Sequence, residues 1–154
     1  MTASDRLSTM GLTLPEATAP AANYLPAVRS GDLIFLSGHL CKRDGHIVRG
    51  SVGVSGDWTS TEAADLARLA AIDLLGSAAE AAGGVNNIEQ VVKVTGYVRS
   101  TADFTDQPLV INGASDFFVE VFGDAGRHAR ASVGVSALPL GAAVEIDAIV
   151  RVKT

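Results

Sequence analysis

Two oppositely charged residues, Arg130 and Glu145, stand in apolar segments near the end of the 154-residue chain. The two segments read as strands of a closing hairpin, joined by a short Pro/Gly turn. Alternation places Arg130 and Ser132 on one face of the first strand, while Glu145 and Asp147 point away from the apolar face of the second. Charges in strands that look half or fully buried are costly unless they are paired or used, so we expect the functional site here.

The chemistry of the two residues suits a small carboxylate and a water molecule. The guanidinium of Arg130 is a planar fork of donors that matches a carboxylate in bidentate geometry. Glu145 has the right group to orient a water and shuttle its proton, and hydrolysis of an electrophilic imine needs little more. Two alternatives stay open. In the first, Arg130 forms an interfacial ion pair with Glu145 or Asp147. In the second, Glu145 simply neutralises the charge of Arg130 or Lys93.

The elements that would position these charges follow the order β-β-α-β-α-β-β. Strands are expected at 25–29, 33–38 and 91–98 and in the two closing segments, and helices at 4–10, 59–82 and from Gln107 or Pro108 to Phe122. This order predicts an α+β fold with helices on one face of a mixed or antiparallel sheet. The length fits a single domain, residues 1–154, with an N-terminal arm over about 1–22.

Local signals define the helices further. Thr59 and Glu62 match a capping box, and Gly83 follows the last helical residue. Ser4 is the expected cap of the first helix. The residues expected on the buried faces are Ala63, Leu66, Ala70, Leu74, Ala78 and Ala81 in the long helix, and Leu109, Phe117 and Phe118 or Val121 in the next. The extended arm from Leu12 to Pro20 is expected to cover a sheet edge or a neighbouring subunit, or else to form a disordered tail.

Composition narrows the classes of partner. Hydrophobic residues make up 47% of the chain and the mean hydropathy is +0.28, which favours an oligomer. The net charge of -5 argues against nucleic acid as a partner. The single cysteine, Cys41, excludes an intrachain disulfide and a cysteine-based zinc site, and we expect neither a metal nor a cofactor. No signal peptide or membrane span is visible, so we expect a cytoplasmic protein.

Four stretches, in their order and spacing, resemble the Rid family (reactive intermediate deaminases, also called YjgF or L-PSP proteins). They are Tyr24 with 33–39, then 81–95, Asp103-Phe104, and 129–149. The chain looks most like a subgroup with a longer N-terminus that is often labelled as endoribonuclease.

The resemblance implies a chorismate-mutase-like fold, a barrel-like homotrimer and clefts between its subunits. It implies that each cleft hydrolyses 2-imino or 2-enamino acids to 2-keto acids and ammonia. By the same resemblance, Arg130 binds the substrate carboxylate, Ser132 offers a backbone amide, and Glu145 holds the attacking water. Ser132 stands where many members have cysteine, so thiol chemistry at this position is excluded.

The resemblance also implies further substrate-binding residues. Tyr24 matches a tyrosine that closes the cleft, although a buried or interfacial tyrosine is the alternative. Ser37 and Gly38 end a buried strand, where small side chains let a ligand approach the backbone. His39 stands where glutamine is common. Asn112 matches an asparagine of the second long helix, or it caps or solvates that helix. His128 is expected on the surface rather than in the site.

Two other functions remain as alternatives to the deaminase. Non-catalytic binding of a small carboxylate metabolite would use the same Arg130. Endoribonuclease activity is suggested by the subgroup's label, but the acidic charge balance speaks against it.

Overall fold

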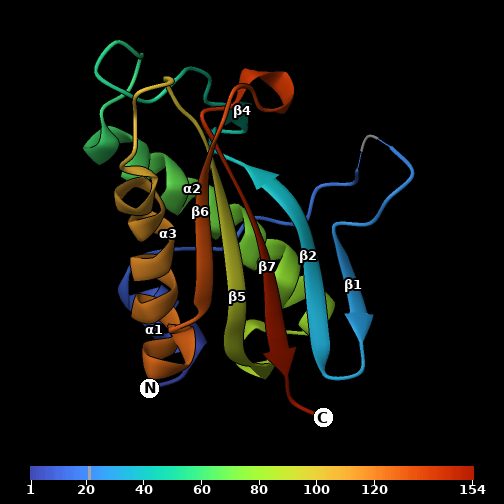
Figure 1. Ribbon diagram of the computed structural model, residues 1–154. Coiled ribbons are helices and arrows are strands. Elements are labelled where there is room, and N and C mark those ends of the chain that lie inside the picture. Colours follow the sequence, from blue (N-terminus) through green and yellow to red (C-terminus); the bar gives the residue numbers. More distant parts are fainter. Residues whose placement is uncertain (21) are drawn as a thin grey trace.

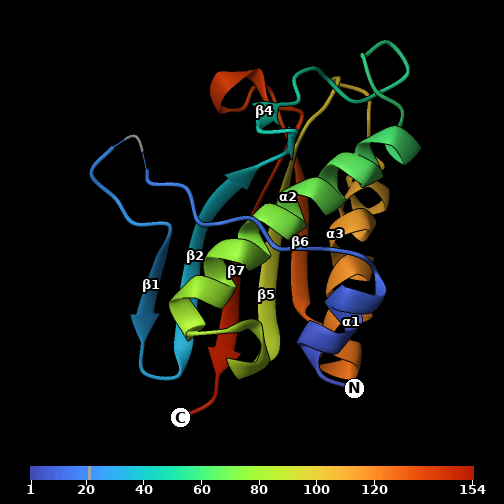
Figure 2. The same ribbon diagram turned by 180° about the vertical axis from the view of Figure 1, so that it is seen from behind.

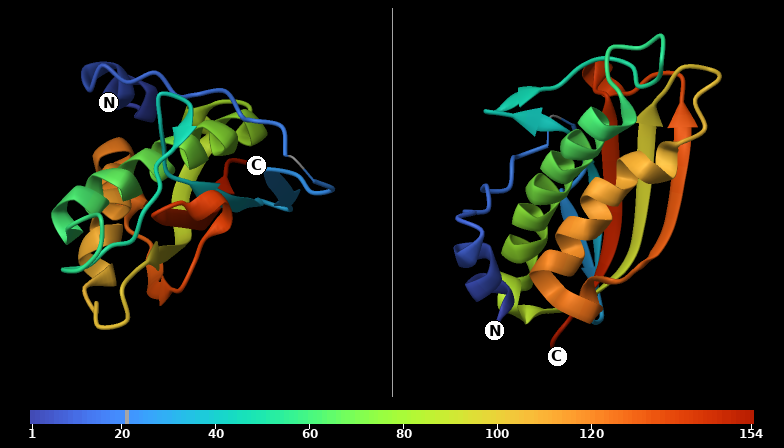
Figure 3. Two further views of the ribbon diagram at one scale, coloured as in Figure 1. Left: turned by 90° about the horizontal axis from the view of Figure 1, so that it is seen from above. Right: turned by 90° about the vertical axis from the view of Figure 1, so that its left-hand side faces the viewer.

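A five-stranded mixed sheet carries two long helices on one of its faces (Figures 1 and 3). The computed structural model describes residues 1–20 and 22–154. The strand order is β1 (Ala27–Ser30), β2 (Leu33–Leu40), β7 (Val144–Val152), β5 (Ile88–Arg99) and β6 (Ala129–Val135). Neighbours are antiparallel except β5 and β6, which run parallel. The expected α+β fold, with helices on one face of a mixed sheet, is confirmed.

The last two strands, β6 and β7, do not form a hairpin. Val94 of β5 pairs with Arg130 on one side and with Ala148 of β7 on the other, so β5 lies between them. The hairpin prediction was wrong because a short connection only makes pairing common, and here η3 (Pro139–Gly141) carries the chain past the end of β5. The expected burial of the first closing strand was also wrong, because β6 is an exposed edge of the sheet.

The long helix α2 (Ser60–Ala82) begins and ends where the sequence predicts. Thr59 Oγ1 accepts from the backbone N–H of Glu62 at 3.2 Å, and the Glu62 carboxylate accepts from the Thr59 N–H at 2.9 Å. Gly83 ends the helix in the left-handed conformation, with φ of 73°, which suits a residue without Cβ. The buried face is wider than the predicted stripe, and Ala81 lies outside it, exposed.

The second long helix, α3 (Gln107–Phe122), packs beside α2 on the same face of the sheet (Figure 2). Its buried residues include Phe117, Phe118 and Val121, as predicted. Leu109 is exposed instead, because it lies in the first turn, beyond the edge of the α2–α3 contact. Between α3 and β6 the chain forms η2 (Gly123–Gly126).

The N-terminal segment lies on the outer side of the helices. α1 (Ala3–Thr9) is capped by Thr2 rather than by Ser4, and it packs on α3. The arm that follows crosses α2 (Figure 2), where the carbonyl of Pro15 lies close to Gly76. The described part of the arm therefore covers a helix, and residues 18–20 lie beside the outer edge of β2 near its end. No helix within residues 1–20 or 22–154 is long and apolar enough to cross a membrane.

Two small elements complete the described chain. A second, two-stranded sheet is formed by β3 (Lys42–Arg43) and β4 (His46–Ile47), directly after β2. The short helix η1 (Val85–Asn87) connects α2 to β5. The other face of the large sheet carries no helix (Figure 3), and it presents exposed apolar side chains such as Phe35 and Val133.

Candidate functional site

The guanidinium of Arg130 is held in place by α3. Its Nη1 donates to the side-chain oxygen of Asn112 at 2.8 Å and to Ser115 Oγ at 3.0 Å. Those two bonds use both hydrogens of Nη1, so Nε and Nη2 keep the parallel pair of donors that a carboxylate accepts. Within residues 1–20 and 22–154, no carboxylate lies within ion-pair distance of Arg130. The open alternative of an ion pair with Glu145 or Asp147 is not formed inside one chain.

His128 extends this network behind Ser115. Its Nε2 lies 3.0 Å from Ser115 Oγ, and its Nδ1 lies 2.7 Å from the carbonyl of Gly126. Burial, with a smaller contribution from the charge of Arg130, lowers the pKa of His128. A neutral ring with its proton on Nδ1 satisfies all of these contacts, since Ser115 then donates to Nε2 and accepts from Arg130. The prediction of a surface histidine was wrong.

Ser115 is the residue that sequence reasoning missed. Asn112 and Ser115 are three positions apart on α3 and therefore share a helical face. That spacing was a visible signal, but it identifies a site only once β6 is known to lie beside that face. The side chain of Asn112 accepts a hydrogen bond from Arg130 and so helps to orient the guanidinium.

Ser132 lies two positions along β6 on the same side of the sheet as Arg130, opposite Gly96 of β5. Its hydroxyl is buried, and it has no hydrogen-bond partner among the described residues. A buried hydroxyl without a partner is rare in folded proteins.

Glu145 lies on the opposite, helix-free face of the sheet. It pairs with Leu40 on β2 and with Tyr97 on β5, and its carboxyl group lies directly over Gly38. Burial, with a smaller contribution from the negative charge of Asp147, raises the pKa of Glu145.

Asp147 is the second carboxylate on this face, and it is already engaged. Its Oδ2 accepts from the hydroxyl of Tyr97 at 2.7 Å, and this bond is the main reason that the pKa of Tyr97 rises to about 12. Among residues 1–20 and 22–154 the Glu145 carboxyl has no such partner, so its oxygens stay free for a water molecule.

A β-bulge brings Gly38 under Glu145. Leu36 pairs with Ala148 and His39 with Ile146, so β2 has one residue more than β7 between the two pairs. The extra residue bends the strand and re-aims its side chains, a common device beside active sites. As a result His39 turns to the helix side and Gly38 to the side of Glu145. Alternation continued from Ile34 and Leu36 would put each of them on the other face.

Tyr24, Ser37, Gly38 and His39 gather around one cavity of about 280 Å³ at the β1–β2 side of the molecule. Ser37 Oγ donates to the carbonyl of Leu25 at 2.6 Å, which ties the segment before β1 to β2. Tyr24 is 54% exposed, so it is not the buried tyrosine of the alternative interpretation. His39 is buried, with Nδ1 2.6 Å from the Ser37 carbonyl and Nε2 2.9 Å from Ser77 Oγ, and burial lowers its pKa.

The predicted site residues thus fall into two groups within one chain. Arg130, Ser132 and Asn112 lie at the β6 edge on the helix side. Glu145 lies on the other face of the sheet, two strands away from β6. It is also three positions further along, because Tyr97 of β5 pairs with Glu145 on one side and with Val133, not Arg130, on the other. Strand spacing and residue rise place the two backbones roughly 14 Å apart. A small substrate cannot touch both groups inside one chain.

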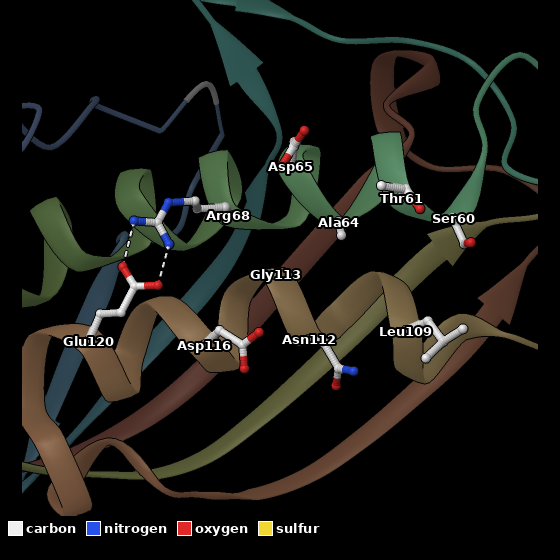
Figure 4. A pocket seen from close by; sticks show the side chains of 10 residues that line it. All are labelled: Ser60, Thr61, Ala64, Asp65, Arg68, Leu109, Asn112, Gly113, Asp116 and Glu120. Atoms are coloured by element: carbon white, nitrogen blue, oxygen red, sulfur yellow. Dashed lines mark hydrogen bonds and ion pairs between the residues drawn. The ribbon is translucent and has the colours of Figure 1, made fainter.

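A groove of about 410 Å³ between α2 and α3 is a different feature (Figure 4). Asp65, Asp116 and Glu120 line it, and Arg68 forms a two-pronged ion pair with Glu120, at 2.8 and 3.1 Å. Asn112 also borders the groove, but its side chain points away from this pair and bonds Arg130. Across the described ranges 1–20 and 22–154, no three His, Cys, Asp or Glu side chains are grouped as a metal site.

Comparison with known proteins assigns this chain to a family. Residues 4–149 match the family described as "YjgF/chorismate mutase-like, putative endoribonuclease". The chain belongs to this family. Protein TCP17 of Trypanosoma cruzi is 44% identical over 149 residues, which is 96% of this chain and 92% of that protein. A "2-iminobutanoate/2-iminopropanoate deaminase" of Dermatophagoides farinae is 30% identical over 142 residues, 92% of this chain and 95% of the relative.

Three solved structures differ in how closely their folds match this chain, as measured by the TM-score. A protein of unknown function from Agrobacterium tumefaciens has a TM-score of 0.88 at 41% identity, covering 98% of this chain and 92% of its own. A "putative endoribonuclease" from Shewanella oneidensis has a TM-score of 0.92 at 29% identity, covering 99% and 100%. The YjgF gene product of Escherichia coli reaches only 0.61 at 25% identity, covering 90% and 94%. The two higher scores belong to structures that span nearly all of this chain, its N-terminal arm included.

Proposed function

We propose that the protein hydrolyses 2-imino and 2-enamino acids to 2-keto acids and ammonia, in clefts between the subunits of a homotrimer. The observation that carries this proposal is the oriented guanidinium of Arg130, whose Nη1 is bound by α3 while its Nε and Nη2 keep a donor pair for a carboxylate. The mite relative named as an imine deaminase supports the choice of reaction.

In this reaction Arg130 holds the substrate carboxylate and Glu145 handles the proton of water. The water oxygen attacks C2 of the N-protonated imine while the Glu145 carboxylate takes one of its protons, which gives a neutral carbinolamine. Glu145 returns that proton to the amine nitrogen and the C2–N bond breaks with release of ammonia. As C2 and the oxygen form the keto group, the hydroxyl proton passes through the carboxylate to the ammonia, which leaves as ammonium. The raised pKa of Glu145 suits this role, because a carboxyl whose pKa is closer to the working pH can both accept a proton and return it.

The separation of the two residues requires a second subunit. Arg130 lies on the edge strand β6, whereas Glu145 lies on the helix-free face of the middle strand β7, beside Gly38 of β2. In a head-to-tail ring each interface joins two different surfaces, here the β6 edge of one subunit and the Glu145 face of the next, and three subunits give the three clefts that the family resemblance implies. The exposed apolar side chains of Phe35, Val28 and Val133 support burial against a second copy.

The test is release of ammonia and pyruvate from freshly generated 2-iminopropanoate. Wild type is expected to accelerate release above the buffer blank, and Arg130→Ala to lose at least about 100-fold in kcat/KM, since a charged hydrogen-bonded pair is removed. Arg127→Ala is the matched control, because this exposed arginine is three residues away and pairs only with Asp124 in the described chain.

The outcomes separate the deaminase from its alternatives. Wild type that matches the blank while still binding pyruvate through Arg130 would make the protein a carboxylate-binding protein without turnover. An equal loss of kcat/KM in Arg130→Ala and Arg127→Ala would show that Arg130 is not a substrate-binding residue.

A further inference from the structure

A mostly apolar cavity lies beside the proposed reaction centre. We call it the side-chain cavity, the space of about 280 Å³ that Tyr24 and Gly38 border. β1 pairs with β2 only as far as Leu36, so the outer edge of 37–40 is free of a strand partner and forms one wall of the cavity. Gly38, whose other side contacts the Glu145 carboxyl, borders the cavity, and the cavity reaches round the sheet edge to His39 and Asp73 on the helix side.

The walls of the cavity combine apolar groups with one neutral ion pair. The apolar lining residues are Pro20, Pro26, Leu40, Ile47 and Leu140. At the helix side, Lys42 Nζ and Asp73 Oδ2 lie 3.4 Å apart, so their charges offset each other. Both ring nitrogens of His39 are engaged with Ser37 and Ser77, and the ring adds no free charge.

Leu140 supports a ligand-binding role for the cavity. Its backbone is left-handed, with φ of 57°, a conformation that costs a residue with Cβ free energy. The same residue leaves 67% of an apolar side chain exposed at the cavity wall. A strained, exposed leucine is a cost to the single chain, and it is explained if the side chain contacts a ligand.

We propose that the side-chain cavity receives the side chain of the 2-imino acid and selects long, uncharged side chains over methyl and acidic ones. This inference rests on the proposed function, which puts C2 of the substrate beside Glu145 and Gly38. The volume of the cavity approaches the ~300 Å³ at which small-ligand pockets begin, so a methyl group would leave most of it unfilled. An acidic tip would meet Asp73, and it could be bound only by breaking the ion pair with Lys42.

The experiment measures binding of three 2-oxo acid products by calorimetry, so that it does not depend on turnover. We expect 4-methyl-2-oxopentanoate to bind at least ~10-fold more tightly than pyruvate, because each buried methylene adds to affinity, and 2-oxoglutarate to bind more weakly than 4-methyl-2-oxopentanoate. Ile47→Phe fills the cavity and should abolish the preference over pyruvate. Ile72→Phe makes the same change on α2 outside the cavity and should keep it.

Two further variants guard against simple misfolding of Ile47→Phe. Leu140→Gly relieves the left-handed backbone and removes one apolar wall, so it should fold well and reduce the preference for 4-methyl-2-oxopentanoate several-fold. Asp73→Asn leaves Lys42 without its partner and should strengthen 2-oxoglutarate binding several-fold. Asp65→Asn is its control on the same helix, since Asp65 lines the α2–α3 groove instead.

The outcomes keep the two proposals distinguishable. Equal binding of the three acids, a preference unchanged by both Ile47→Phe and Leu140→Gly, or no binding at all would overturn the side-chain cavity. If imines are hydrolysed but the acids bind equally, only the cavity proposal fails. If the preference and its loss in the variants are seen without hydrolysis of any imine, the cavity stands and the deaminase fails.

Discussion

At the residue scale, the burial of Glu145 makes this carboxyl group a source of instability as well as of chemistry. Its folded-state pKa lies above its ordinary value, so folding favours the protonated form. The destabilisation is absent below the unfolded-state pKa and complete once the pH has risen through the folded-state pKa. Active-site groups commonly carry such a cost.

Glu145→Gln should therefore raise the Tm at neutral pH and leave it near the wild-type value at a pH below the ordinary pKa of glutamate. Thermal unfolding across this pH range measures the effect, with the exposed Glu16→Gln as control. A Tm gain that is equally large in acid would show that the amide stabilises by packing instead of by removing a buried charge.

The same carboxyl should control the pH dependence of imine hydrolysis. As the pH falls through the raised pKa of Glu145, the carboxylate that accepts the proton of water is lost, so kcat/KM should decline on the acid side. In Glu145→Gln the residual rate should be low and free of that decline. An unchanged acid limb in this variant would assign the limb to another group.

Gly38 is a residue whose size matters. A Cβ at this position would overlap the Glu145 carboxyl oxygen and displace it. Gly38→Ala should lower kcat for imine hydrolysis about tenfold or more, with less effect on KM, because a misplaced base harms the chemical step more than carboxylate binding. Wild-type kcat in a folded Gly38→Ala protein would contradict the placement of Glu145 at the reaction centre.

At the scale of elements, α3 and β6 act as a unit that orients Arg130. Asn112→Ala and Ser115→Ala should each raise KM about tenfold, since each removes a hydrogen bond to a charged group worth ~1.5 kcal/mol. Asp116→Ala, on the groove side of α3, should leave KM unchanged.

A double-mutant cycle for Asn112 and Ser115 is informative because both side chains bond the same atom, Nη1 of Arg130. The loss in Asn112→Ala/Ser115→Ala should differ from the sum of the single losses. Strict additivity would show that the two side chains do not act through one oriented guanidinium.

Local sequence signals predicted the helices well, and they failed where partners come from elsewhere in the chain. The capping box at Thr59 and the stop at Gly83 depend on neighbouring residues alone, and both are found. The pairing of β6 with β5 depends on a segment more than thirty residues earlier, and a short connection suggested the wrong partner. The bulge after Leu36 is likewise set by register with β7.

The faces of the charged residues were predictable because alternation, like a helix cap, depends on neighbouring residues alone. Alternation alone put Arg130 and Ser132 on one face and Glu145 and Asp147 away from the apolar face of their strand, as the pairings have them. Alternation could not say that the two faces are opposite sides of one sheet, because that follows from the strand order. Ser115 was missed because its spacing from Asn112 indicates a site only once β6 is known to lie beside that face of α3.

At the scale of the whole molecule, the separation of Arg130 from Glu145 allows a complementation test. Arg130→Ala and Glu145→Gln subunits should each be inactive alone, whereas an interface that takes Arg130 from one and Glu145 from the other would be intact. Random mixing in a head-to-tail ring makes about a quarter of the interfaces intact, so about a quarter of wild-type activity should return. Activity that stays at the level of either parent after co-refolding would mean that each site is built within one subunit.

The position of β7 has a consequence for how the protein is made. β7 is the middle strand of the sheet, flanked by β2 and β5, yet it is the last strand in the sequence. Synthesis runs from the N-terminus, so while the chain is still emerging from the ribosome, β2 and β5 each present an unpaired edge to a gap. The sheet closes only after Val144–Val152 has left the ribosome. A chain that stops before Val144 keeps two open edges and should aggregate rather than fold.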